Sequence, residues 1–343
     1  MADAIIVDGV RKKYRDKWAL DGLDLKVARG TVHGLLGPNG AGKTTAVRTM
    51  TTLLRADGGR VEVAGYDVRR QAGEVRRRIG LLGQHAAVDE ELGGWQNLEM
   101  FGRLHHLGAR RARVRAGELL ERFGLAGTGR KAVRQYSGGM RRRLDLAASL
   151  ITDPEVLFLD EPTTGLDPRG RAEVWDAVRS LVGGGTTVLL TTQYLEEADQ
   201  LADRISVVDR GRVVAEGTSD ELKARLGGDR IDVVVRDSSQ LGVVAGLLPH
   251  GPGGPGGPGG PGGPGGADGA VVDADRRLVS APVADRMAAL TEVVRALQDA
   301  GVEAEDIVMR RPTLDEVFLH LTGSGQKGAA ERGHVSDRPE VKA

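Results

Sequence analysis

The feature that most constrains this chain is a glycine-rich stretch between a strand-like and a helix-like run, written GLLGPNGAGKTTAVRTM. Gly37 is followed by four residues and then by Gly42, Lys43 and Thr44. This spacing predicts a P-loop, in which successive backbone N–H groups surround phosphates. Lys43 is expected to reach the β and γ phosphates, and Thr44 to offer its hydroxyl to Mg²⁺. The predicted phosphate contacts are Gly37, Pro38, Asn39, Gly40, Ala41, Gly42, Lys43, Thr44 and Thr45.

An acidic pair follows a second strand-like run, in the stretch EVLFLDEPTTGLDP. The apolar residues suit a strand that is buried on both faces, and Asp160 and Glu161 come where the strand ends. Because parallel sheets bind ligands at the carboxyl ends of their strands, both carboxylates are expected to face the nucleotide. Asp160 is then predicted to hold Mg²⁺. Glu161 is predicted to polarise an attacking water, a role worth about 10²- to 10⁴-fold in rate.

A third stretch, YSGGMRRRLDLAASLI, predicts a helix whose first turn can hold an anion. Ser137 is a good N-cap, and Gly138 and Gly139 let another group approach the free N–H donors of the first turn. The three arginines that follow, residues 141–143, are interpreted as a solvated helix face and are left out of the site. The stretch therefore predicts an anion site that is separate from the P-loop.

Short apolar runs alternate with helical patterns from residue 1 to about 226, which indicates an α/β fold with a largely parallel sheet. The early segments AIIVDGV and GRVEVAGYDV favour antiparallel pairing, so a mixed sheet is expected at that end. Residues 92–150 break the alternation and are predicted to form an inserted helical subdomain. These patterns together predict a nucleotide-binding domain over residues 1–226.

The composition changes after Gly227 and Gly228, and a second domain is predicted over residues 229–323. Its pattern, β-α-β-β-α-β, is that of a ferredoxin-like α+β fold. The repeat GPGGPGGPGGPGGPGG at 251–266 has the period of collagen but too few triplets, and a flexible spacer is favoured. Residues 324–343 are polar and aperiodic, which predicts a disordered tail.

Length and charge limit the classes of function. The 343 residues suit two domains, and the 48 basic residues equal the 48 acidic ones, so no overall field favours nucleic acid or an anionic membrane. The absence of cysteine excludes disulfides, thiolate metal sites and a cysteine nucleophile. No signal peptide and no apolar run near the ~20 residues of a membrane span is present, so the chain by itself is expected to be soluble.

The order P-loop, YSGGM, LFLDEP and GLD resembles the ATP-binding cassette (ABC) ATPases over residues 4 to about 226. The resemblance implies ATP and Mg²⁺ as cofactors and a homodimer in which two cassettes stack head to tail. It further implies that Ser137, Gly138 and Gly139 of one copy close over the γ-phosphate held by the other copy. The predicted anion then belongs to a second chain.

Four further positions carry over from the same family. Tyr14 resembles the aromatic that stacks on adenine, and Asp167 resembles the aspartate that crosses the dimer seam. Gln84 resembles the glutamine that contacts Mg²⁺ and the attacking water. The family usually places histidine where this chain has Gln193, whose amide can donate a hydrogen bond but cannot carry a proton or charge. Glu161, Gln84 and Gln193 are thus the predicted catalytic residues, and Thr44, Gln84 and Asp160 the predicted metal ligands.

A narrower resemblance concerns TTQYLEEADQLADRI and the C-terminal RRPTLDEVFLHLTG, which are similar to ATPases of the daunorubicin-type drug exporters. It implies work with a separately encoded integral membrane permease of ABC-2 type, at the cytoplasmic side of the cell membrane, and no nucleic-acid partner. It also implies that the second domain regulates or stabilises the dimer. A partly exposed Trp95 or Phe101 is a candidate contact for the permease.

Two other readings remain open from sequence. A nucleic-acid ATPase is suggested by basic runs such as RRARVR, although the chain lacks the long coiled coils of repair cassettes and the second cassette of ribosomal ones. A regulatory module without catalysis is suggested by the missing histidine, although Lys43, Asp160 and Glu161 are intact. Salt-dependent nucleic-acid binding and phosphate release, respectively, test these alternatives.

Overall fold

The chain divides into two compact units, Met1–Ser219 and Asp220–Ala343. The computed structural model describes residues 2–224, 229–248, 270–283, 285–314 and 316–318. The glycine pair predicted at the domain boundary, the spacer at 251–266 and the tail at 324–343 lie outside the described residues. Every residue of the predicted nucleotide site belongs to the first unit.

The first unit is built on a six-stranded sheet of order β10-β9-β3-β8-β7-β6. All neighbours are parallel except the antiparallel pair β9 and β10, which confirms a mixed, mainly parallel sheet. Each of β3, β7 and β8 is buried along its whole length, as expected for apolar runs covered on both faces. The strands are β3 (Val32–Leu36), β6 (Ile79–Leu82), β7 (Val156–Asp160), β8 (Thr187–Thr192), β9 (Arg204–Asp209) and β10 (Arg212–Gly217).

A second sheet, of order β2-β1-β4-β5, holds the early strands. The antiparallel pairing predicted for these strands is confirmed, but they form a sheet of their own and do not extend the parallel one. Their alternating burial explains the difference, because only one face of each strand is apolar enough to pack on a core. The strands are β1 (Asp3–Tyr14), β2 (Lys17–Ala28), β4 (Gly58–Val63) and β5 (Tyr66–Asp67).

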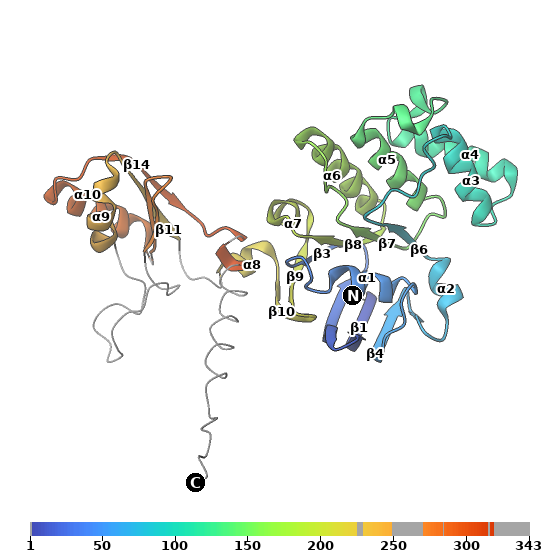
Figure 1. Cartoon of the computed structure of the whole chain (residues 1–343), viewed down its shortest axis with the longest axis horizontal. Coiled ribbons are helices and arrows are strands. Elements are labelled where there is room, and N and C mark those ends of the chain that lie inside the picture. Colours follow the sequence, from blue (N-terminus) through green and yellow to red (C-terminus); the bar gives the residue numbers. More distant parts are fainter. Residues whose placement is uncertain (1, 225–228, 249–269, 284, 315, 319–343) are drawn as a thin grey trace, which may run out of the picture. The chain divides into compact units, whose positions relative to one another are not determined.

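The two faces of the six-stranded sheet belong to two apolar clusters. Phe158 and Leu189 pack with the antiparallel sheet and with Met50 of α1, whereas Leu157 and Leu190 pack with the helices that follow β6. Figure 1 shows α1, β1 and β4 on one side of the sheet and α3 to α6 on the other. The helices of this unit are α1 (Lys43–Met50), α2 (Ala72–Arg76), α3 (Gly94–Leu104), α4 (Ala109–Arg122), η1 (Ala126–Thr128), η2 (Val133–Gln135), α5 (Gly138–Ser149), α6 (Pro168–Gly183) and α7 (Leu195–Leu201), with α8 (Ser219–Ala224) at the unit boundary.

The second unit contains a four-stranded antiparallel sheet of order β12-β13-β11-β14. With its two helices this is the β-α-β-β-α-β plan, so the ferredoxin-like prediction is confirmed. Its core packs Ile231 and Val233 of β11 against Val244 and Val293 of the helices. The elements are β11 (Arg230–Val235), η3 (Ser238–Gln240), α9 (Leu241–Leu247), β12 (Val271–Asp273), β13 (Leu278–Pro282), α10 (Arg286–Asp299) and β14 (Ala304–Arg310). In the ranges that the structure describes, no helix combines the length and the apolar sequence needed to cross a bilayer.

Candidate nucleotide site

The glycine-rich loop joins the carboxyl end of β3 to the first turn of α1 and is tightly enclosed. A Cβ on Gly37 would lie 2.4 Å from the Val208 carbonyl oxygen, and one on Gly42 would lie 2.3 Å from the Ala19 carbonyl oxygen. Gly42 also has a φ of 108°, a conformation that side chains disfavour. The Gly37 N–H donates to the Thr192 carbonyl at 3.4 Å, which ties the loop to the end of β8. The glycines are therefore required by packing as well as by any ligand.

Lys43 lies in the first turn of α1 with only 4% of its side chain exposed. Its Nζ donates to the carbonyls of Gly37 at 2.7 Å and Pro38 at 3.1 Å, and lies 3.7 Å from Glu161 Oε1. Burial lowers the pKa of Lys43, and the charges of Glu161 and Asp160 oppose that shift. The loop thus holds a buried cation that a phosphate could partner.

Polar side chains gather around the hydroxyl of Thr44. Thr44 Oγ1 donates to Asp160 Oδ1 at 3.3 Å and accepts from Gln84 Nε2 at 3.2 Å. Thr191 Oγ1 of β8 donates to the same Asp160 oxygen at 2.5 Å and orients the carboxylate. A hydroxyl, a carboxylate and an amide that lie within hydrogen-bond reach fit a Mg²⁺ site that is completed by phosphate oxygens and water.

Glu161 follows β7 directly and is held in an uncommon backbone conformation. Its φ is 50°, in the left-handed region that disfavours non-glycine residues. Its N–H donates to the carbonyl of Thr191 at 3.1 Å and also approaches Thr191 Oγ1 at 3.2 Å. Its carbonyl accepts from Arg142 Nη2 at 3.2 Å. These bonds fix the strained residue and position its carboxylate beside Lys43.

The interpretation of residues 141–143 as a solvated face is wrong for Arg142. Only 11% of its side chain is exposed, and it donates to the carbonyls of Pro162 at 2.6 Å and Gly83 at 2.9 Å as well as to that of Glu161. Arg143 is 21% exposed, donates to the Phe123 carbonyl at 3.0 Å and lines the second hollow described below, so leaving it out of the site is also wrong. Only the half-exposed Arg141, which pairs with a surface glutamate, fits the prediction. The carbonyls explain the burial, since several acceptors satisfy one guanidinium.

A second set of predicted residues meets at a separate hollow of about 540 Å³. Ser137, Gly138, Gly139 and Asp167 all line it. Ser137 Oγ accepts from the Met140 N–H at 3.2 Å and caps α5, so the N-terminus of this 12-residue helix opens into the hollow. Asp167 Oδ1 accepts from the Gly170 N–H at 2.8 Å and caps α6 in the same way. The charged side chains that line the hollow balance, Arg143 and Arg169 against Asp167 and Glu173. What favours an anion there is the N-terminus of α5 with its bare backbone.

Two predicted residues lie at the edges of the first cluster. Tyr14 ends β1 with 47% of its surface exposed, in the hairpin that continues into β2 and thus into Ala19 beside the loop. Gln193 is half-buried directly after β8, whose Thr192 pairs with Leu36 before the glycine-rich loop. The carboxyl ends of β3, β8 and β7 therefore bring together the residues that were predicted from separate stretches.

Sequence reasoning missed the buried polar groups that support the site. Arg142, Thr191 and Glu197 all belong to this set. Glu197 accepts from Thr163 Oγ1 at 2.9 Å and from Trp175 Nε1 at 3.2 Å, and burial raises its pKa. The only sequence signal for them is their position within four residues of a predicted site residue.

Comparison with known proteins agrees with this geometry. The ABC transporter family model matches residues 20–164. The chain is 75% identical to the daunorubicin resistance ATP-binding protein DrrA3 of Streptomyces coeruleorubidus. The alignment covers 95% of this chain and 98% of that protein. It is 49% identical to the daunorubicin/doxorubicin resistance ATP-binding protein DrrA of Streptomyces peucetius, in an alignment that covers 93% of this chain and 92% of that protein.

Solved structures of ABC transporter ATP-binding proteins also match this chain. CbiO1 of Clostridium perfringens, part of an ABC transporter complex, superposes with a TM-score of 0.61 at 26% identity, over 65% of this chain and 92% of that one. The ATP-binding cassette MJ0796, a dimer in a post-hydrolysis state with ADP and Pi, gives a TM-score of 0.57 at 25% identity, over 62% of this chain and 98% of that one. The identity to the resistance proteins over nearly the full length of the chain places it in the family of ABC transporter ATP-binding subunits, which are ATPases.

Proposed function

We propose that this chain is the ATPase subunit of an exporter that removes a drug or antibiotic through a separate ABC-2-type permease. The resistance proteins named above support drug export as the work that hydrolysis performs. The match to transporter subunits favours this function over a nucleic-acid-associated or regulatory ATPase. The observation that carries the proposal is the pair of half-sites on one chain, which a second copy can complete.

The first half-site holds ATP and Mg²⁺ in this proposal. Lys43 and the loop N–H groups bind the β and γ phosphates, and Tyr14 stacks on adenine. Thr44, Asp160 and Gln84 hold Mg²⁺, which when bound neutralises charge on the phosphate oxygens. Glu161 accepts first a hydrogen bond and then a proton from the attacking water, whose oxygen bonds to the γ-phosphorus as the bond to the leaving ADP oxygen breaks. The backbone of Glu161 has a left-handed φ, and both its N–H and its carbonyl are hydrogen-bonded, which keeps the carboxylate in place for this step.

Gln193 contacts the γ-phosphate as a neutral donor. It follows β8 next to the strand that carries Asp160, so its amide can reach the same face of the site. Because an amide does not titrate, the pH dependence of turnover should contain no histidine-like pKa near ~6.5 that depends on residue 193. Gln193→His should introduce one. Loss of all activity in Gln193→Ala together with full activity in Glu161→Gln would contradict these roles.

The second half-site binds the γ-phosphate of the partner copy. Ser137 Oγ accepts from a backbone N–H, so its hydroxyl hydrogen can donate to phosphate. Gly138 and Gly139 allow the backbone to approach, and Asp167 lies at the seam. The second unit regulates or stabilises this dimer. ATP then joins two subunits, and hydrolysis releases them.

The membrane permease binds beside the loop that follows Gln84, where it can respond to changes at the nucleotide site. A hollow of about 230 Å³ lies between the sheet and α3, lined by Phe101, by the exposed Leu53 and by Ala87 of the loop that follows Gln84. The Ala87 N–H donates to the buried Asp145 at 2.9 Å, which connects this lining to α5. An apolar helix of the permease seated there places the subunit on the cytoplasmic side of the cell membrane.

The decisive experiment uses Glu161→Gln, which should bind MgATP without turnover. Sedimentation should then show a dimer with MgATP and a monomer without it. Ser137→Ala in the same background should weaken the dimer while radiolabelled ATP still binds, and Lys43→Ala should lose both. A monomer of Glu161→Gln with bound ATP would contradict the two-chain site.

A further inference from the structure

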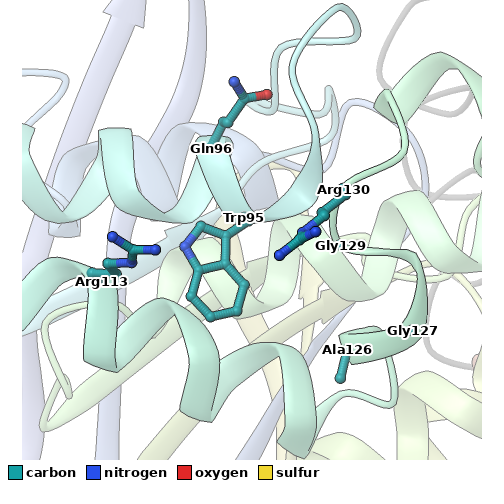
Figure 2. A pocket seen from close by; sticks show the side chains of 7 residues that line it. All are labelled: Trp95, Gln96, Arg113, Ala126, Gly127, Gly129 and Arg130. Atoms are coloured by element: carbon teal, nitrogen blue, oxygen red, sulfur yellow. The ribbon is translucent and has the colours of Figure 1, made fainter.

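A cavity of about 750 Å³ lies at the start of α3, outside both half-sites. It is lined by residues of α3, α4 and the loop around η1, namely Trp95, Gln96, Arg113, Ala126, Gly127, Gly129 and Arg130. Figure 2 shows the guanidinium groups of Arg113 and Arg130 on opposite sides of the Trp95 indole, while the Gln96 side chain points away. Its volume is in the range of ordinary small-molecule sites, about 300–1,000 Å³.

The two cations of this cavity have no acidic partner within the described residues. Nearby acids are instead paired with other arginines. The carboxylate oxygens concerned each lie close to a guanidinium nitrogen: Glu91 Oε2 is 3.1 Å from Arg134 Nη1, Glu99 Oε1 is 3.0 Å from Arg103 Nη2, and Glu118 Oε2 is 3.2 Å from Arg115 Nη1. No acid lines the cavity itself, so its local field is positive although the whole chain is neutral.

The indole between the arginines is held as a rigid platform. The Trp95 N–H of the backbone donates to the Gly129 carbonyl at 2.9 Å, which anchors the residue at the start of α3. A Cβ on Gly117 of α4 would lie 3.1 Å from the ring atom Cη2, so the ring packs closely over that glycine. The ring Nε1–H makes no hydrogen bond in the part of the chain that the structure describes. The cavity therefore offers an aromatic surface, one neutral donor and two charged, planar donors.

We propose that this cavity binds a flat aromatic acid, whose ring lies against Trp95 and whose carboxylate is attracted by the guanidinium groups of Arg113 and Arg130 at the two sides of the indole. A guanidinium matches a carboxylate with two parallel hydrogen bonds, and an aromatic ring stacks on indole with offset geometry. The acid is either a free small molecule or the carboxyl-terminal aromatic residue of a peptide. The site shares no residue with the proposed ATP or dimer contacts, and Trp95 is the residue that it has in common with the candidate permease contacts. Binding of the acid to the isolated chain can therefore be tested independently of ATP binding and dimer formation.

The test measures binding of 2-naphthoate to the full chain by calorimetry. 2-Naphthamide and 2-naphthylmethylamine are the neutral and cationic comparators, and both should bind at least about tenfold more weakly than the acid. Arg113→Gln and Arg130→Gln should each weaken naphthoate binding about tenfold, the effect of one charge-assisted hydrogen bond. Arg111→Gln is the matched control, because Arg111 is an exposed arginine of the same helix that does not line the cavity. It should leave the dissociation constant unchanged.

Further binding measurements distinguish the two sources of the acid, and a control detects variants that misfold. Trp95→Leu should weaken naphthoate more than it weakens acetate, because only the former has a ring to stack. A short peptide that ends in phenylalanine, compared with the same peptide amidated at its carboxyl end, tests the peptide source. Preference for the free-acid peptide over naphthoate assigns the site to a protein partner, and the reverse assigns it to a free acid. MgATP binding must be unchanged in every variant. Equal binding of the acid and the amide, or naphthoate affinity indifferent to both arginines, overturns the proposal.

Discussion

Replacing Arg142 by lysine should separate the role of this buried guanidinium from that of its charge. The side chain donates to the carbonyls of Gly83, Glu161 and Pro162 and lies 3.4 Å from Asp145, which is 3% exposed. Lysine keeps the positive charge for Asp145 but has one nitrogen, which cannot reach three carbonyls in different loops. At least two of the three hydrogen bonds are therefore expected to be lost.

The expected destabilisation follows from those bonds. Each hydrogen bond to a charged group contributes about 1.5–3 kcal/mol, so losing two costs about 3 kcal/mol at the lower bound. For a unit of this size about 1 kcal/mol shifts the unfolding midpoint by about 2–4 °C, which gives a drop of about 6–12 °C. Because the Glu161 carbonyl is one of the acceptors, we also expect ATP turnover to fall by about 10- to 100-fold through misplacement of its carboxylate.

The neighbouring Arg141→Lys is the matched control for both measurements. Arg141 makes one half-exposed ion pair with Glu90 at 2.8 Å, and such surface pairs contribute only about 0–1 kcal/mol. Thermal unfolding should therefore separate the two variants by several degrees, and a phosphate-release assay should find Arg141→Lys near wild type. Equal midpoints and equal turnover for the two variants would refute the assignment of the three carbonyl contacts.

Three further outcomes follow from contacts in the same unit. Gly42→Ala should abolish ATP binding in an equilibrium filter assay, because its Cβ would lie 2.3 Å from a carbonyl oxygen, whereas Gly40→Ala, with open space around its Cβ, should retain part of it. Tyr14→Ala should weaken ATP binding by about 1–3 kcal/mol, the range for base–aromatic stacking, and Tyr14→Phe should restore it in the same assay. Glu197 has a pKa raised by burial, so folding favours its protonated form and wild-type stability falls as pH rises through that pKa. The thermal midpoint of Glu197→Gln relative to wild type should therefore be higher at pH 8 than at pH 5, and a constant difference would contradict the shift.

The main elements of the fold could be predicted from sequence, because short stretches of sequence determine them. The strands at the centre of the sheet are short apolar runs, and the glycine-rich loop has a spacing that few other structures require. The ferredoxin-like order of the second unit followed from the sequence of element types alone. In each of these cases the pattern along the chain carries the physical constraint.

The supporting polar groups could not be predicted, because their causes are contacts between distant segments. Arg142 resembles its two neighbours in sequence, and the approach of the Gly83 and Pro162 carbonyls makes it the least exposed of the three, with 11% of its side chain exposed. Glu197 is one of two adjacent glutamates, and the hydroxyl of Thr163 and the indole of Trp175 single it out. The separate antiparallel sheet was missed for the same reason, since pairing partners are chosen by tertiary packing.

The placement of Arg142 gives α5 a mechanical role that its N-terminus alone does not imply. The helix begins beside Ser137 at the hollow proposed for the partner's phosphate, and about one turn later Arg142 bonds the carbonyls that flank Glu161 and Gln84. In the proposed dimer, a phosphate at the first turn is therefore linked through this helix to the loops that carry Glu161 and Gln84 of the same chain. If both proposed half-sites are correct, closure over one ATP is coupled to the site that holds the other through Arg142, without any contact between the two nucleotides.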